Sequence, residues 1–149
     1  MVREQRWEFR WAYRDNDGEW VEKVCYPRSE EKKDANVAKC REAGYKVISI
    51  KKLYPFSTER NQHNFMLISN ICSNRMHDML HGEAEYDEAE YERLWELKEK
   101  ADRFYGLPLP VAWLPWEDLK EARGLAMEAV EHRANACVEA GRPDLVQYC

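Results

Sequence analysis

Residues 6–14 alternate between aromatic side chains on one side and mainly charged side chains on the other, a period of two that is typical of a half-buried β-strand. The aromatic side consists of Trp7, Phe9, Trp11 and Tyr13. The segment 15–18, DNDG, follows with residues that tolerate the backbone of a tight turn, and residues 20–26 can return as a second strand. The chain is therefore expected to begin with a β-hairpin.

A helix and a third strand are expected directly after this hairpin. Ser29 can cap a helix that runs to about Ala43, because its hydroxyl can accept from the free amides of the first turn, and Gly44 can close that helix. Residues 45–54 alternate and are rich in β-branched and aromatic side chains, so they predict a third strand that ends at Pro55. The order is ββαβ, with the third strand joining the hairpin.

Three longer helices are predicted in the rest of the chain, because apolar residues recur there at steps of three and four. They span residues 57–81, 87–105 and 116–140. Asp87 is expected to cap the second of them, with Glu90 as its capping-box partner. Residues 107–116 contain three prolines among apolar residues and predict an extended, packed connector. The predicted class is α+β, an antiparallel three-stranded sheet with one helix followed by three longer helices.

Length and composition predict one domain over residues 1–149, with a ββαβ subregion over 1–56 and a helical subregion over 57–149. Its five cysteines show no C-x-x-C spacing and are expected to be reduced thiols. The chain has no apolar stretch of the length that a signal peptide or membrane span requires. A cytoplasmic protein without membrane contact is therefore expected.

Two histidines, His77 and His81, lie four residues apart with Asp78 beside the first, a spacing at which both imidazoles can reach one zinc ion. This resembles the H-E-x-x-H motif of zinc peptidases, with the catalytic Glu replaced by a shorter Asp. Two ligands do not make a site, so two solvated polar residues are the simpler interpretation and no metal is predicted. A metal-dependent hydrolase is retained as an alternative hypothesis.

An uncharged polar stripe follows the same predicted helix, opposite its apolar face. It consists of His63, Asn70, Asn74, His77 and His81. Such a stripe offers hydrogen-bond donors and acceptors but little charge, whereas a solvated helix face usually carries Lys and Glu. Contact with a partner and an ordinary exposed face are both compatible with this pattern.

Six acidic residues within ten positions, with no base among them, form the most unusual charge feature of the chain. They are Glu83, Glu85, Asp87, Glu88, Glu90 and Glu92. Acids in the first turn of a helix favour its dipole, which accounts for three of the six but not for Glu83, Glu85 and Glu92. Closely spaced carboxylates on a stable scaffold can also imitate a nucleic-acid backbone and dock into a basic groove.

The predicted sheet carries the opposite charge, because Arg6, Arg10 and Arg14 should project from one side of the first strand. Residues 1–60 hold 14 Lys and Arg against 11 Asp and Glu, whereas residues 61–149 hold 9 against 17. Arginines beside aromatic residues can bind RNA or DNA, although cross-strand pairs with glutamate explain them without a ligand. A nucleic-acid-binding or regulatory module is thus a second hypothesis.

No phosphate-binding glycine loop, dinucleotide-binding motif or nucleophile elbow occurs, so neither a cofactor nor a catalytic residue is predicted. In the segments 7–20, 54–65 and 107–116 the chain resembles small accessory proteins of bacterial mobile elements and phages. That resemblance implies an anti-defence role, such as a stoichiometric anti-CRISPR or anti-restriction inhibitor.

The acidic run and this resemblance together predict a non-catalytic inhibitor or accessory protein that occupies the basic, nucleic-acid-contacting surface of a host-defence nuclease. The six acids would supply charge, and the stripe from His63 to His81 would supply hydrogen bonds. A protein partner is expected; direct nucleic-acid binding and a homodimer formed through the alanine-rich last helix remain alternatives.

Overall fold

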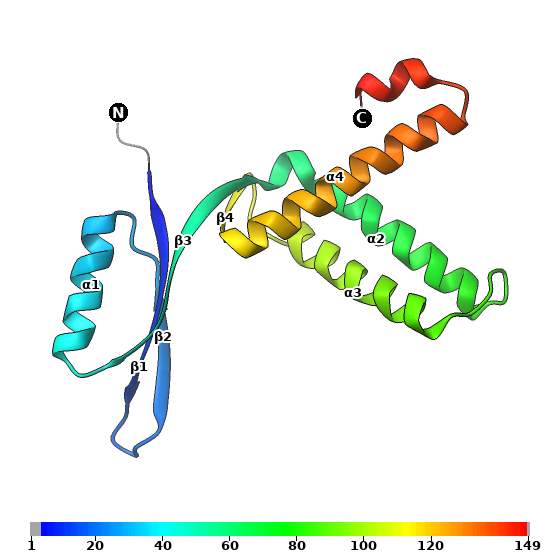
Figure 1. Ribbon diagram of the computed structural model, residues 1–149. Coiled ribbons are helices and arrows are strands. Elements are labelled where there is room, and N and C mark those ends of the chain that lie inside the picture. Colours follow the sequence, from blue (N-terminus) through cyan, green and yellow to red (C-terminus); the bar gives the residue numbers. More distant parts are fainter. Residues whose placement is uncertain (1–3, 149) are drawn as a thin grey trace. The chain divides into compact units, whose positions relative to one another are not determined.

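The computed structural model describes residues 4–148 and has an α+β fold, which confirms the predicted class (Figure 1). Its elements in chain order are β1 (Arg6–Arg14), β2 (Trp20–Cys25), α1 (Glu30–Glu42), β3 (Lys46–Ser57), α2 (Thr58–Leu80), α3 (Glu88–Tyr105), β4 (Val111–Pro115), α4 (Trp116–Glu139) and a 3₁₀ helix (Pro143–Tyr148). No helix in the described part of the chain is both long and apolar enough to cross a membrane.

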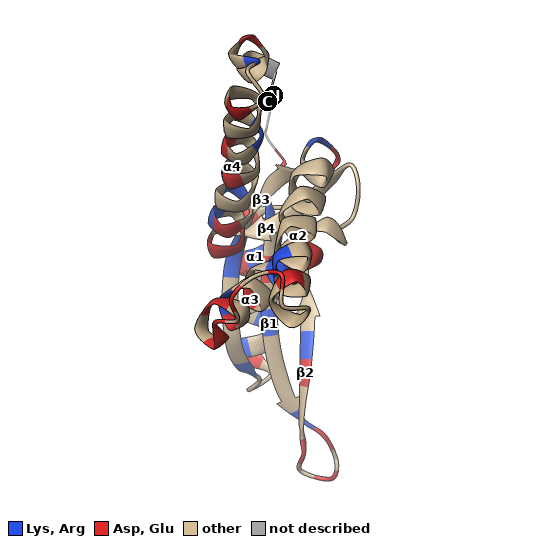
Figure 2. Ribbon diagram, turned by 90° about the vertical axis from the view of Figure 1, so that its right-hand side faces the viewer, with Lys and Arg blue, Asp and Glu red and all other residues tan. Residues whose placement is uncertain are grey.

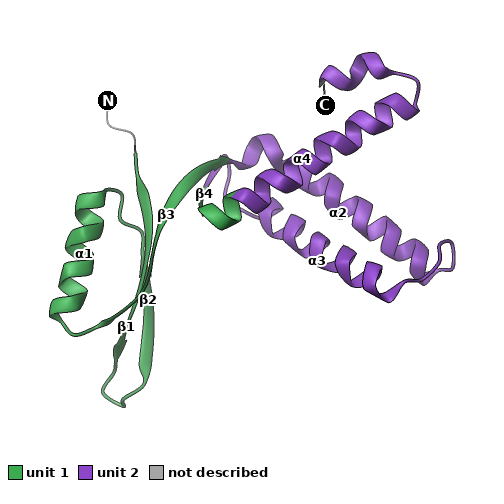
Figure 3. Cartoon of the chain, viewed as in Figure 1, with its two compact units in different colours: residues 1–56, 113–119 green, residues 57–112, 120–149 purple. Residues whose placement is uncertain are grey.

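Two compact units divide the chain, as coloured in Figure 3. Unit 1 comprises residues 1–56 and 113–119, and unit 2 comprises residues 57–112 and 120–149. The boundary after residue 56 coincides with the expected end of the ββαβ subregion. Residues 113–119, which come much later in the sequence, also belong to unit 1. The expectation of a single domain stays a prediction.

Unit 1 is built on the hairpin of β1 and β2, which pair antiparallel, and β3 pairs antiparallel with the other edge of β1. Ser29 caps α1 as expected, since its hydroxyl accepts a hydrogen bond from the Lys32 amide at 3.1 Å. Helix α1 packs on β1 and buries Val37 and Cys40 against Phe9. The aromatic side of β1 therefore contributes to the core of this unit. Burial in that core raises the pKa of the Cys40 thiol.

Within residues 4–148 the sheet has four strands rather than the expected three, in the order β2-β1-β3-β4. Residues 111–115 of the proline-rich connector form β4, an edge strand, which is where a sheet tolerates proline. The expected end of β3 at Pro55 is also wrong, because the strand continues to Ser57. Pairing with β1 ends at Leu53, so the missing N–H of Pro55 removes no hydrogen bond on that side.

Unit 2 is centred on α2 and α3, which run side by side with their apolar faces together (Figure 1). The buried residues are Phe65, Ile68, Cys72, Met76 and Met79 of α2 and Leu94, Ala101 and Phe104 of α3. Tyr91 and Leu97 of α3, which steps of three from Leu94 place near the same apolar face, are only half-buried. Asp87 caps α3 by accepting from the Glu90 amide at 3.2 Å, as predicted, whereas the Glu90 carboxylate, the expected second half of a capping box, pairs with Arg75.

The first turn of α2 is held by the proline-rich connector instead of by its own cap residue, since the Ser57 side chain makes no capping hydrogen bond. The amides of Thr58 and Glu59 both donate to the Pro110 carbonyl, at 3.0 and 3.2 Å. The buried Thr58 hydroxyl donates to the Pro108 carbonyl at 2.7 Å. These bonds satisfy helix-end groups that would otherwise lack partners.

Thr58→Val should therefore lower the free energy of unfolding by roughly 1–3 kcal/mol, because the substitution keeps the shape but leaves the Pro108 carbonyl without its donor. Urea unfolding followed by circular dichroism measures the loss. Thr58→Ser is the control, since it retains the hydroxyl and should cost less. Equal stability of Thr58→Val and the unmodified protein would contradict this role for the hydroxyl.

Candidate functional site

The turn between α2 and α3 is fixed by backbone hydrogen bonds at its start. The amides of Glu83 and Ala84 both donate to the Asp78 carbonyl, at 2.9 and 3.2 Å. Gly82 adopts a φ of 75°, the left-handed conformation that closes the helix and that residues other than glycine rarely adopt. The acidic segment that begins at Glu83 therefore starts directly after a helix end whose backbone is fixed by hydrogen bonds.

Acidic residues follow this turn and continue along the outer face of α3, where Figure 2 colours them red. One of the six predicted residues is neutralised, since Glu90 pairs with Arg75 at 2.5 Å and lies 4.0 Å from Arg93. The remaining five are exposed and form no ion pair with a Lys or Arg of residues 4–148. They are Glu83, Glu85, Asp87, Glu88 and Glu92. We call these five residues the acidic surface.

Glu96 and Glu99 extend the acidic surface, because steps of four, four and three from Glu88 keep residues on one face of a helix. Trp95 lies on this face as well and is 51% exposed. The sequence interpretation missed these three residues. The helical period could have found them, since Trp95 directly follows buried Leu94 and must lie away from the apolar stripe.

A hollow of about 380 Å³ opens beside the turn between α2 and α3. It is lined by Arg75, Met79, Ala84, Glu85, Tyr86, Asp87 and Glu90. The pair of Arg75 and Glu90 holds α2 to the start of α3 within this lining. Its polar lining and the exposed Tyr86 ring fit contact with another macromolecule better than enclosure of a small apolar ligand.

All five residues of the predicted polar stripe on α2 are exposed: His63, Asn70, Asn74, His77 and His81. The imidazole rings of His77 and His81 lie 4.1 Å apart between centroids, and His77 Nδ1 lies 4.0 Å from the Asp78 carboxylate. Among residues 4–148, no three or more His, Cys, Asp or Glu are grouped so that they could hold a metal ion. The structure thus brings these two histidines together but supplies them with no third ligand in its described part.

The three arginines of the sheet differ in their partners. Arg10 lies 3.0 Å from Glu8 and 3.5 Å from Glu22, and its hydrogen bond to the Glu8 carboxylate raises the pKa of its guanidinium group. Arg6 pairs with Glu4 at 3.0 Å. Arg14 instead lies over the Trp20 ring, 4.9 Å from its centroid. Glutamate therefore neutralises two of the three arginines, but the contact of Arg10 with Glu22 is the one of these pairs that joins two strands, as the ligand-free explanation expects.

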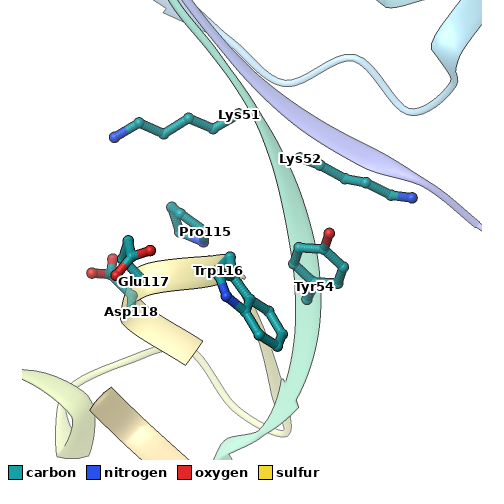
Figure 4. A pocket seen from close by; sticks show the side chains of 7 residues that line it. All are labelled: Lys51, Lys52, Tyr54, Pro115, Trp116, Glu117 and Asp118. Atoms are coloured by element: carbon teal, nitrogen blue, oxygen red, sulfur yellow. The ribbon is translucent and has the colours of Figure 1, made fainter. Parts of the chain in front are cut away.

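A second hollow, of about 320 Å³, lies in unit 1 and is shown in Figure 4. It is lined by Lys51, Lys52, Tyr54, Pro115, Trp116, Glu117 and Asp118. The Tyr54 and Trp116 rings meet edge to face with centroids 5.7 Å apart, and the two lysines point to opposite sides of β3. Sequence alone could not find this hollow, because β3 and the start of α4 are far apart in the chain. Its cations and anions balance, so it favours no ligand of one charge.

Comparison of this chain with models of known families, with curated proteins and with solved structures finds no match. No activity is therefore assigned by similarity. The chemistry of the exposed surfaces, above all the unpaired carboxylates at the turn of unit 2, is what points to a function.

Proposed function

We propose that this protein is a non-catalytic binding protein whose acidic surface occupies the basic, nucleic-acid-contacting surface of a protein partner. The observation that carries the proposal is that five neighbouring carboxylates are exposed without an ion pair to the described residues. Three lie in a turn whose start is fixed by backbone hydrogen bonds, and two lie at the start of α3. Like charges held together on a rigid mount repel one another, so the arrangement lowers stability unless a cationic partner offsets it.

Exposed negative charge on a binding surface mainly changes the rate at which a partner associates. A cluster of negative groups steers a basic partner into encounter and raises the association rate, in a manner that salt weakens. The same basic surface normally binds phosphates, so the acidic surface and a nucleic acid would compete for it. Inhibition would then be stoichiometric and would require no chemical step.

The partner class that we propose is a nuclease of a host-defence system, for which a basic groove is the substrate-binding surface. The exposed stripe from His63 to His81 supports this proposal, because it provides neutral donors and acceptors on the helix that leads into the acidic turn. Trp95, within the acidic face of α3, supplies an exposed aromatic ring of the kind enriched where protein interfaces are most tightly packed.

The test replaces four members of the acidic surface and spares Asp87, which caps α3. In the test variant Glu83, Glu85, Glu88 and Glu92 are each replaced by Gln. The control variant has the same change in net charge and replaces four exposed acids of unit 1, Glu19, Glu30, Glu31 and Glu42, by Gln. Circular dichroism should show both variants folded, because all eight side chains are exposed.

Immobilised protein is exposed to a bacterial lysate and eluted with DNA, which releases proteins held through a nucleic-acid-binding surface. The association rate of an eluted partner should fall about 10- to 100-fold at low salt in the test variant, with a flatter salt dependence. The control variant should change the rate much less. An unchanged rate in the test variant, or an equal loss in both variants, would overturn the proposed role of the acidic surface.

A further inference from the structure

Only one face of the sheet in unit 1 is covered by α1, and the opposite face presents an excess of cations. Side chains of directly paired residues share a face, so the register of the strands assigns both faces. The face away from α1 also contains Ala12 and Leu53, which are buried. Its other residues are Arg6, Glu8, Arg10 and Arg14 of β1, Trp20, Glu22 and Val24 of β2, and Lys46, Ser49 and Lys51 of β3. We call this set the cationic sheet face.

The two carboxylates of this face are both used by one arginine, since Glu8 and Glu22 each bind Arg10. Of the other four cations, Arg6 pairs with Glu4, which precedes the strand. Arg14, Lys46 and Lys51 form no ion pair with an Asp or Glu of residues 4–148. The uncompensated charge of the face is therefore positive and lies mostly beside Trp20.

Two of these cations, Arg14 and Lys46, lie beside the ring of Trp20. The Arg14 guanidinium lies 4.9 Å from the centroid of its ring, and the Lys46 amino group lies 5.9 Å from it. The side chain is 53% exposed, although a tryptophan of a hairpin would gain free energy from burial. Val24, the last residue of β2 on this face, is also exposed, with Glu22 between it and Trp20.

We propose that the cationic sheet face binds single-stranded nucleic acid, a function separate from that of the acidic surface. A base can stack on the exposed part of the Trp20 ring while Arg14 and Lys46 bind the adjoining phosphates, the combination that single-strand-binding surfaces use. Lys51 is not part of this phosphate path, because it lines the hollow that Glu117 and Asp118 also line. A single strand fits better than a duplex, because only unstacked bases can reach an aromatic side chain on a sheet.

The test measures fluorescence anisotropy of a labelled oligothymidylate of about 12 nucleotides with the full chain at two salt concentrations. The variant Arg14→Gln/Lys46→Gln should raise the dissociation constant at low salt about 10-fold or more and reduce the salt slope by about 1.4. Trp20→Ala should weaken binding about 5- to 100-fold with an unchanged slope, because it removes stacking and not charge.

The matched control is Lys23→Gln/Lys39→Gln, which removes the same charge from exposed lysines on the side of the sheet that α1 covers. It should alter affinity less than 3-fold, by roughly the effect of net charge alone. No binding of the oligonucleotide at low salt, or an equal loss in the test and control variants, would overturn the proposal. So would binding of duplex DNA with the same affinity and the same response to Trp20→Ala.

Self-association through this face is tested by measuring the oligomeric state of the same variants. Salt-sensitive dimers that Arg14→Gln/Lys46→Gln dissociates, without oligonucleotide binding, would assign this face to a second copy of the chain and overturn the proposal. The acidic-surface variant should bind oligothymidylate at least as tightly as the unmodified protein, since it loses negative charge only. The two functions can therefore fail independently.

Discussion

Phe65→Ala is expected to lower the free energy of unfolding by about 3–5 kcal/mol, which is a third or more of the stability of a typical domain. Phe65 is completely buried in α2, and its ring lies 5.6 Å from that of Phe104 in α3. Truncation leaves a cavity between two helices that are already packed along their length, so the site can relax only in part. Chemical denaturation of the unmodified protein and the variant measures the difference.

The control for this prediction is Met66→Ala, which removes a side chain of similar length from the next position of the same helix. Met66 is exposed, so its loss should cost roughly 0.5 kcal/mol. Phe104→Ala should show strong coupling to Phe65→Ala in a double-mutant cycle, by about 0.5–1.5 kcal/mol for the ring pair. Additive effects of the two substitutions would contradict direct packing of these rings.

This core matters for the proposed function because it supports the acidic turn. Met79 and Leu94 lie in the buried faces that lead into and out of that turn, and the ion pair of Arg75 and Glu90 joins the two helices there. A destabilised hairpin of α2 and α3 would let the five carboxylates move apart. Loss of partner binding in Phe65→Ala should therefore appear at temperatures at which the unmodified protein is still folded.

Phe9→Ala should have an effect of similar size, about 3–5 kcal/mol, on unit 1. Phe9 is completely buried in the middle of β1 and packs with Val37 and Cys40 of α1 in a small core that Trp11, Cys25 and Val47 border. A hollow of about 330 Å³ already borders Phe9 and Trp11, so the loss of the ring would remove much of what holds α1 to the sheet. Near-ultraviolet circular dichroism, which reports the fixed environment of Trp7 and Trp11, follows this change during denaturation.

Val24→Ala on the neighbouring strand is the comparison for Phe9→Ala. Val24 is exposed on the opposite face of the sheet, so its truncation should cost roughly 0.5 kcal/mol or less. Similar losses in both variants would show that side chains on the two faces contribute equally to stability. That result would contradict the assignment of the core to the side that α1 covers.

The two proposed binding surfaces belong to different units and differ in the sign of their charge. In unit 2, five acidic residues are exposed and form no ion pair with a Lys or Arg of residues 4–148. In unit 1, Arg14 and Lys46 lie beside a half-exposed tryptophan. Replacing acids should weaken only the interaction with a basic protein, whereas replacing cations should weaken only the interaction with a single strand, which makes the two proposals separable by experiment.

Local sequence determined those parts of the structure that depend on neighbours within about four residues. The alternation of residues 6–14 predicted β1, Ser29 and Asp87 predicted two helix starts, and Gly82 predicted a helix end. Caps and side-chain periods act through hydrogen bonds and contacts within one turn of helix or one strand. Such features can be derived from the chain without knowledge of its fold.

Tertiary structure alone decided which distant residues meet. The connector became β4 because β3 had a free edge, and Thr58 found its partners in Pro108 and Pro110. Arg75 of α2 neutralised Glu90 of α3, although both helices were predicted correctly. An ion pair or strand pairing joins residues whose separation in space is unrelated to their separation in sequence, so the compensated charges and the unpaired ones become distinguishable only in the folded chain.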